Sequence, residues 1–484
     1  MNEMQNTYIR NQILTMPQRL NKELSYENKQ FNKRSDYENI KKYIDNFLDG
    51  KNINRFLVLP GIRDVGKTTL LFQTYEHLLK EKGISPQNIL YFSCDRLKKM
   101  GDVDIFEVVS SYCQTYHNSI IETVNEPVFI LIDEAQYDRD WSLNGKLIFD
   151  GSQNIFMIFS GSSALKLSYN SDAARRLLTL PIYPLTYSEH LKLKYKDFEN
   201  NISKPLIRMI FDGEMEKSGE LERRMLNIYS NFENYDVGEW KHFLTFGGFP
   251  SSSYQNTNEI RKKLINIIDK VVTTDMSNIE GINDDTKYLA FQILNYFAFQ
   301  NPGEVSKGSL SNHFNVNMTT VTKVLEILEK TQLIFHIEAF TSSVKRTTKP
   351  HEYFFATSSL KHNLSSDVGN ATLEDEKAYM GKLLETYVAS SFHDLDEKSD
   401  ISYKTYYDDS KKKSSDQNVD FIVQRGDEKP IPIEVSCGKK DKSQIQRAMR
   451  KYQSPHGVII SNTTSNIVRK DNIIYLPPEI FAFI

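Results

Sequence analysis

One eight-residue segment, Gly61–Thr68, constrains the fold of this chain more than any other. It reads Gly-Ile-Arg-Asp-Val-Gly-Lys-Thr and satisfies the pattern G-x-x-x-x-G-K-[ST] at every fixed position. The apolar run Phe56–Leu59 precedes it, and Thr69–Phe72 opens a helix after it. In a strand, turn and helix of this kind, backbone N–H groups and the positive end of the helix surround an anion. The segment therefore predicts an α/β unit built around a phosphate-binding loop.

This loop supplies candidate contacts to a bound nucleotide. Lys67 is expected to reach the β- and γ-phosphates and to serve catalysis there, while the Thr68 hydroxyl ligates Mg²⁺. The implied cofactors are therefore ATP and Mg²⁺. The full set of candidate nucleotide contacts is Gly61, Ile62, Arg63, Asp64, Val65, Gly66, Lys67, Thr68, Thr69 and, further along the chain, Ser160. The competing interpretation is a glycine turn on the surface that binds nothing.

Length and composition limit the class of protein. A chain of 484 residues is too long for one core, so two to four domains are expected. The net charge of −3 excludes a polycation, so any nucleic-acid surface must be a local patch. The three cysteines are scattered and form no zinc or disulfide pattern. With no signal peptide and no apolar run of about 18 residues, we expect a cytoplasmic protein with no membrane partner.

The first part of the chain alternates strand-like and helix-like segments. Residues 1–50 are polar and helical in pattern, which predicts a helical lead-in. Residues 51–191 are predicted to form one domain with a parallel sheet, because short apolar runs suit strands buried on both faces. These runs are Phe56–Leu59, Ile89–Phe92, Val128–Ile132 and Ile155–Phe159. Residues 192–280 are predicted to form a helical lid or extension.

Two carboxylates end the third of these runs. Asp133 and Glu134 follow Val128–Ile132 directly, and ligands of open α/β sheets bind at the carboxyl ends of the strands. Asp133 is expected to hold Mg²⁺, directly or through water. Glu134 is expected to be the general base that polarises the attacking water, a pairing that favours hydrolysis over transfer to a second substrate. The alternative is a strand that ends in solvated acids.

Hydroxyls and arginines follow the fourth run. Ser160, Ser162 or Ser163 is expected to contact the γ-phosphate or orient water, with a plain turn as the alternative. Arg176, or failing that Arg175, is the candidate for stabilising the charge that develops during phosphoryl transfer. Two adjacent arginines are also common on a solvated helix face.

These motifs together resemble a bacterial and archaeal AAA/STAND-type ATPase family that carries a nuclease-like domain at its C-terminus. Gly61–Leu71 resembles the family's G-P-R-Q-V-G-K-T-T-L-L loop, with Ile62 and Asp64 in place of its Pro and Gln. Tyr183–Glu189 is similar to its F-P-L-S-F-S-E segment, and Phe246–Pro250 contains its G-G-F-P element. In the same alignment Arg176 matches the family arginine, whereas Arg175 replaces its glycine.

Residues 281–360 have the element order of a winged helix-turn-helix domain. The expected elements are helices at Leu289–Ala298, Ser309–Phe314 and Thr319–Glu329, then wing strands at Leu333–Ile337 and Tyr353–Phe355. The third helix carries as many acids as lysines on its exposed side. Because phosphate contacts supply most non-specific affinity, the sequence predicts weak DNA or RNA binding at best. A module that binds a protein partner is equally compatible with this pattern.

The last segment, residues 372–484, resembles the restriction-endonuclease-like fold. Gly381–Val388 matches its helix, and Val419–Phe421 and Ile433–Val435 match two of its strands. The resemblance implies a second metal site at Glu385, Asp420 and Glu434. An active domain of this type also has a lysine two residues after the last acid.

Serine occupies that lysine position in this chain, at Ser436. Lys439 or Lys440 would have to swing in from the following turn to replace it. We therefore expect a degenerate domain that binds or scaffolds rather than cuts.

The sequence as a whole predicts an α/β fold: a P-loop NTPase sheet with a helical region, then a winged-helix domain and a small restriction-endonuclease-like domain. The predicted activity is Mg²⁺-dependent ATP hydrolysis that switches the arrangement of the C-terminal domains. Two alternatives stay open, a nucleotide-gated binding module with little turnover and an ATP-regulated DNA or RNA nuclease in defence or mobile-element conflict. Whether the chain forms oligomers depends on whether Arg176 acts within its own subunit.

Overall fold

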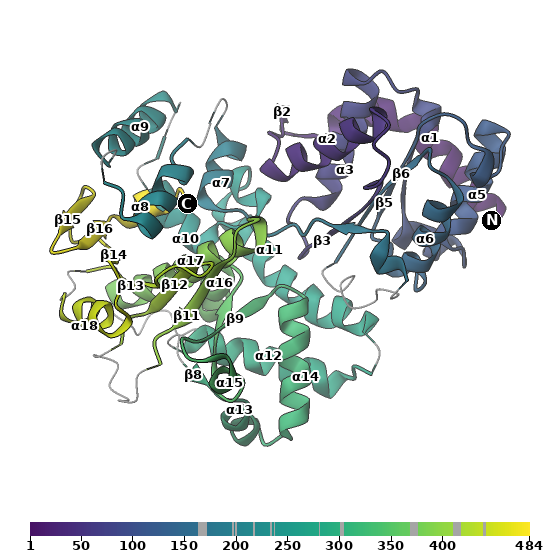
Figure 1. Ribbon diagram of the computed structural model, residues 1–484. Helices are drawn as coiled ribbons and strands as arrows, with labels where there is room; N and C mark the ends of the chain where they lie inside the picture. Colours follow the sequence, from purple (N-terminus) through teal and green to yellow (C-terminus); the bar gives the residue numbers. More distant parts are fainter. Residues whose placement is uncertain are drawn as a thin grey trace. The chain divides into compact units, whose positions relative to one another are not determined.

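The computed structural model divides the chain into two compact units (Figure 1). The N-terminal unit contains Met1–Tyr183 and Thr273–Gly281, and the C-terminal unit contains Pro184–Val272 and Ile282–Ile484. The structure describes residues 1–162, 172–195, 198, 201–215, 218–232, 235–236, 238–279, 281–300, 304–367, 376–409, 418–438 and 442–484. Within these ranges, no helix has the length and apolar character needed to cross a bilayer.

A five-stranded parallel sheet forms the centre of the N-terminal unit, in the order β4-β5-β6-β3-β7. Its strands are β3 (Phe56–Pro60), β4 (Ile89–Ser93), β5 (Val128–Asp133), β6 (Ile155–Gly161) and β7 (Leu178–Thr179). All residues of the four long strands are buried. The predicted parallel sheet is therefore confirmed, and helices lie on both of its faces (Figure 1).

The helices of this unit are α1 (Glu3–Glu23), α2 (Ser35–Leu48), α3 (Lys67–Glu76), α4 (Cys94–Met100), α5 (Ile105–His117) and α6 (Trp141–Gly151). Helix α1 begins with a capping box, in which Asn2 accepts from the Gln5 amide and the Gln5 side chain accepts from the Asn2 amide. A two-stranded hairpin, β1 (Ser25–Tyr26) and β2 (Lys29–Gln30), separates α1 from α2. Residues 1–50 thus contain two helices with this hairpin between them.

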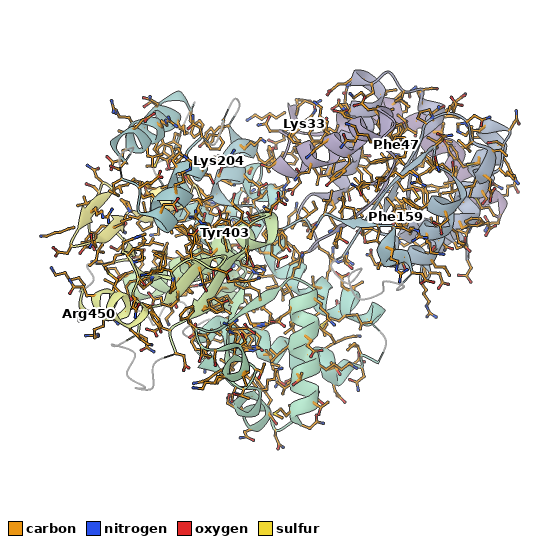
Figure 2. All side chains as sticks on the ribbon, in the orientation of Figure 1. Lys33, Phe47, Phe159, Lys204, Tyr403 and Arg450 are labelled. Carbon is orange, nitrogen blue, oxygen red and sulfur yellow. The ribbon has the colours of Figure 1, made fainter. Side chains whose placement is uncertain are left out.

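Aromatic and aliphatic side chains fill the core of the N-terminal unit. Phe159 on β6 points into it (Figure 2), with its ring centroid 4.8 Å from that of Phe56 and 5.9 Å from that of Trp141. Helix α1 contributes Tyr8 and Ile9 to the same core. The lead-in is therefore integral to the N-terminal unit, because its apolar face is buried there.

A nine-stranded mixed sheet runs through the C-terminal unit, in the order β15-β16-β14-β13-β12-β11-β9-β10-β8. Parallel pairing of β11 with β9, at Tyr406↔Glu338 and Tyr407↔Ala339, joins its two halves. The predicted wing and the predicted nuclease-like strands therefore share one sheet. The strands are β8 (Glu304–Val305), β9 (Ile334–Ala339), β10 (His351–Phe355), β11 (Tyr403–Tyr407), β12 (Phe421–Arg425), β13 (Ile431–Ser436), β14 (Gly457–Ser461), β15 (Val468–Lys470) and β16 (Ile473–Leu476).

Helices surround this sheet, and those of the predicted helical extension pack into the same core as its strands. Leu206 and Ile210 of α8 belong to one buried cluster with Val458 and Ile474. The helices are α7 (Tyr187–Lys194), α8 (Ser203–Asp212), α9 (Ser218–Asn231), α10 (Glu239–Phe246), α11 (Thr257–Lys270), α12 (Asp284–Phe299), α13 (Lys307–Phe314), α14 (Met318–Lys330), α15 (Ser343–Arg346), α16 (Ser358–Asp367), α17 (Glu376–Lys398), α18 (Ser443–Tyr452) and α19 (Pro478–Phe481).

Candidate functional site

The two glycines of the loop between β3 and α3 are needed for its backbone path. Gly66, directly before α3, has a φ of +99°, a conformation that residues with a side chain rarely adopt. Gly61 lies against the backbone of Ile182, and a Cβ atom at this position would come within 2.6 Å of the Ile182 carbonyl oxygen. The loop can therefore wrap tightly and lead straight into the N-terminus of α3, as the motif predicted.

Lys67 is buried in the first turn of α3. Its Nζ donates to the carbonyl oxygens of Gly61 and Ile62, both at 2.8 Å. Burial lowers the pKa of Lys67, and the nearby carboxylates of Glu134 and Asp133 act in the opposite direction. The ammonium group is thus held inside the loop and close to both acids.

Asp133, at the end of β5, is the centre of a hydrogen-bond network. Its Oδ2 accepts from the Thr68 hydroxyl at 2.8 Å and from the Tyr91 hydroxyl at 3.3 Å, and its Oδ1 accepts from the Ser160 hydroxyl. The two residues predicted to bind Mg²⁺, Thr68 and Asp133, are therefore in direct contact. Their oxygen donors suit this hard cation.

Glu134 follows in a left-handed conformation, with a φ of +54°. Its carboxylate accepts from the side-chain amide of Gln136, whose own carbonyl oxygen accepts from the Ser162 backbone N–H at 3.2 Å. Burial raises the pKa of Glu134, and the charge of Asp133 adds to this effect. The structure therefore brings the candidate base to the ends of β5 and β6, beside the candidate metal ligands. Ser163 lies outside the described residues.

A cavity of about 300 Å³ opens beside this network. Thr68, Asp133 and Glu134 line one part of it. Arg19 on α1 and Arg96 on α4 line another part. These two arginines were missed from the sequence, because neither lies in a recognisable motif. Glu23, which pairs with Arg19 at 2.6 Å, and Asp95 also line the cavity, so its wall carries both arginines and carboxylates.

The loop residue Arg63 has a partner that the sequence did not reveal. Its guanidinium pairs with Asp275 at 2.6 Å, and Asp275 is only 2% exposed. Burial opposes the charge of Arg63, but the carboxylate outweighs this effect and raises the pKa of the guanidinium. Asp275 lies in the segment Thr273–Gly281, which belongs to the N-terminal unit. It thus places a negative charge at the phosphate-binding loop.

Replacing Asp275 with asparagine is expected to tighten ATP binding. Asp275 acts on both Arg63 and Lys67, so its negative charge opposes a bound triphosphate. Its loss should contribute about 1 kcal/mol, or roughly fivefold in affinity. Equilibrium titration with a fluorescent ATP analogue measures this effect. Asp284→Asn, at a side chain that is 99% exposed, is the control, and unchanged or weaker binding by Asp275→Asn contradicts the prediction.

The arginine candidates lie elsewhere. Arg176 is half-buried against helix α6, where its Nε donates to Asp150 at 2.9 Å. This contact lowers the pKa of Asp150. Arg175 is exposed at the end of the preceding 3₁₀ turn. The structure therefore does not bring either arginine into the network around Asp133.

The three acids of the second candidate metal site lie near one another in the C-terminal unit. Glu385 on α17 is half-buried; desolvation raises its pKa, and the charges of Asp420, Glu352 and Glu434 raise it further. Asp420 also accepts from the Val435 backbone N–H at 2.6 Å. Lys361 on α16, which was not among the residues predicted from the sequence, is buried. Its positive charge lowers the pKa of Glu385 and so opposes the effect of the acids.

Lys361 comes from a helix and not from the strand position that Ser436 occupies. The Ser436 hydroxyl instead accepts from the Gly438 backbone N–H at 3.1 Å. Lys439 and Lys440 lie outside the described residues.

Comparison with known families defines the class of the N-terminal unit. A family described as AAA domain matches residues 53–191, the part that holds the phosphate-binding loop, Asp133 and Glu134. Two further families, both described as domains of unknown function (DUF8612 and DUF4143), match residues 237–370 and 380–481. The chain thus carries an AAA-family P-loop ATPase domain followed by two such domains. The predicted AAA class is confirmed.

A full-length relative places the chain in a family. "Uncharacterized protein MJ1637" of Methanocaldococcus jannaschii is 30% identical over 476 residues, which cover 98% of this chain and 92% of the relative. The chain belongs to the same family as this archaeal protein. An uncharacterized protein of Haemophilus influenzae is 25% identical over 338 residues, covering 66% of this chain and 72% of that protein.

Solved structures resemble the chain only loosely. The Thermotoga maritima RuvB Holliday junction branch migration motor aligns with a TM-score of 0.28 and 15% identity, covering 62% of this chain and 88% of that chain. A likeness of this degree supports no conclusion about function.

Proposed function

We propose that the chain binds and hydrolyses ATP in a Mg²⁺-dependent reaction. The observation that carries this proposal is the network in which Thr68 and Ser160 both donate to Asp133, beside Glu134 and Lys67. A surface turn without a ligand would not need a buried lysine, a buried carboxylate and two hydroxyls at one sheet edge.

In the proposed reaction, each residue has a separate task. The backbone N–H groups of Gly61–Thr69 and the Nζ of Lys67 hold the phosphates. Thr68 and Asp133 hold Mg²⁺, which neutralises charge on the β- and γ-phosphates when bound. Glu134 accepts a proton from water as the water oxygen attacks the γ-phosphorus and ADP leaves. Ser160 fixes the orientation of the Asp133 carboxylate.

Arg176 is proposed to stabilise the charge that develops on the transferred phosphoryl group. Its partner Asp150 lies on α6 and outside the Asp133 network. This role therefore requires Arg176 to leave Asp150 or to serve the site of a second copy of the chain. The second arrangement would make an oligomer the active form.

We further propose the division of labour that the sequence predicted. Residues 1–50 are the helical lead-in, 51–191 the ATPase core and 192–280 the helical extension. Residues 281–360, with α12–α14 and the β9–β10 pair, act as a winged helix that binds DNA or RNA weakly or a protein partner. Residues 372–484 are the restriction-endonuclease-like domain. Nucleotide state changes the arrangement of these C-terminal parts.

Phosphate release from ATP by the purified full chain tests this function. We expect release that requires Mg²⁺ and stops when EDTA is added. The contrary result is protein that retains nucleotide but releases no phosphate, with or without nucleic acid. That result would favour a nucleotide-gated binding module.

One observation favours a second candidate function, an ATP-regulated DNA or RNA nuclease. Asp420 and Glu434 act electrostatically on Glu385. So does the ammonium group of Lys361, which donates to the Phe297 and Gln300 carbonyl oxygens. Acidic clusters of this kind bind Mg²⁺ in hydrolytic sites. Incubation of the chain with plasmid or RNA and Mg²⁺ or Mn²⁺ decides this. Cleavage that Asp420→Ala abolishes would support the nuclease, and the lack of any cleavage would remove it.

A further inference from the structure

Three potential metal ligands lie together on the β9–β10 hairpin, within the predicted wing and outside residues 51–191. His336, Glu338 and His351 each offer one ligand atom, and these atoms all lie within 4.8 Å of one another. Tyr353 pairs with His336 in the strand register, so the same register places His351 opposite Glu338. Residues at alternate positions of a strand share one face, which explains why the three side chains meet.

The two imidazoles are closely stacked. Their ring centroids lie 4.0 Å apart with an interplanar angle of 7°. All three side chains are half-buried, so the rings and the carboxylate can rotate while the strand ladder holds their backbone in place. The ladder therefore fixes the spacing of the donors and leaves their final orientation adjustable.

A second carboxylate near this group comes from a helix. The Glu329 carboxylate, at the end of α14, contacts the Nδ1 of His336. This contact holds the orientation of the His336 ring and joins the hairpin to α14. Glu338 also pairs with Arg346 at 3.5 Å, a partly exposed contact that a bound cation would replace.

This donor set selects a class of metal. Imidazole nitrogen suits Zn²⁺ and neighbouring transition metals, whereas Mg²⁺ and Ca²⁺ prefer sites made of oxygen. A tetrahedral Zn²⁺ at about 2.0–2.1 Å from each donor needs donors about 3.3 Å apart. The ligand atoms of His336, Glu338 and His351 now lie within 4.8 Å of one another. Rotation of these half-buried side chains must therefore shorten each distance by at most about 1.5 Å.

We propose that His336, His351 and Glu338 form a Zn²⁺ site on the β9–β10 hairpin, with Glu329 of helix α14 orienting His336 through its contact with Nδ1. The proposal rests on these contacts and does not depend on ATP hydrolysis. Its physical consequence is local: with the metal bound, α14 and the hairpin move as one body.

Equilibrium dialysis of the metal-free full chain against Zn²⁺, without nucleotide, tests the proposal. We expect about one Zn²⁺ per chain, with His336→Ala and His351→Ala each lowering the affinity at least tenfold. His313→Ala is the matched control, because His313 lies exposed on α13 and contacts Tyr296 and Phe314. Equal Zn²⁺ binding by His336→Ala and His313→Ala would overturn the site, as would a wild-type chain that binds none.

Two further measurements guard against a variant that fails to fold. Zn²⁺ should raise the Tm of the wild type and of His313→Ala, but not of the milder variant His351→Gln. X-ray absorption at the zinc edge should show nitrogen and oxygen ligands near about 2.0–2.1 Å. Sulfur ligands near about 2.3 Å would assign the metal to the cysteines and refute the proposal.

Discussion

Replacing Lys67 with alanine is expected to weaken ATP binding by at least about 100-fold. The Lys67 ammonium is buried within the loop and is held by two loop carbonyl oxygens, where a bound phosphate would meet it. Losing a charged hydrogen bond of this kind costs about 3 kcal/mol, and every 1.4 kcal/mol is about tenfold in affinity. Calorimetric titration of the full chain with ATP and Mg²⁺ measures the change directly.

Lys80→Ala is the matched control for this experiment. Lys80 lies in the short π-helix His77–Glu81, which directly follows α3. Its side chain is 53% exposed and pairs with Glu76 on the surface. Its loss should leave ATP affinity within about twofold, because exposed ion pairs contribute little. Thermal unfolding of both variants separates a loss of binding from a loss of fold. If Lys67→Ala binds ATP as tightly as Lys80→Ala, the loop is not the triphosphate site.

Local patterns account for the parts of the site that the sequence predicted. The runs that became β3, β5 and β6 are short, apolar and buried over their whole length, so their identity needs no knowledge of distant residues. Asp133 directly follows such a run, and parallel strands bring their carboxyl ends to one edge. Thr68 lies in the loop and helix that follow β3, at the same edge, which is why its hydroxyl meets Asp133.

Long-range contacts account for what the sequence could not show. Arg63 and Asp275 are 212 residues apart, and no motif marks Asp275 as a loop partner. Lys361 reaches the surroundings of Glu385 from a helix, so a search for a lysine after Glu434 could not find it. In each case the pairing depends on how separate elements pack, which a single sequence does not encode as a pattern.

The same limit applies to the C-terminal sheet. The sequence indicated the wing strands and the later strands separately, since each has its own apolar run. Their union depends on the parallel pairing of β9 with β11, at Tyr406↔Glu338 and Tyr407↔Ala339. Such a register is set by tertiary packing and not by local propensity. The edge strand β8 is only 2 residues long, too short for a sequence signal.

Replacing Glu134 with glutamine is expected to slow ATP hydrolysis by about 10²- to 10⁴-fold while leaving ATP binding nearly intact. Glutamine keeps the shape of the side chain but cannot accept a proton from water. The carboxylates of Asp133 and Glu134 repel each other, which is one reason that the pKa of Glu134 is raised. Replacing Glu134 with glutamine removes this repulsion. The fold should therefore tolerate the change.

Single-turnover phosphate release, at protein in excess over ATP, isolates the chemical step from binding and product release. Glu126→Gln is the control, because Glu126 is 61% exposed and its side chain forms hydrogen bonds with His117 and Asn88. We expect the wild-type rate from Glu126→Gln, and retained ATP with little phosphate from Glu134→Gln. Lys67→Ala fails earlier, at binding, so the two variants separate the phosphate cradle from the base. Near-wild-type hydrolysis by Glu134→Gln would mean that another group activates the water.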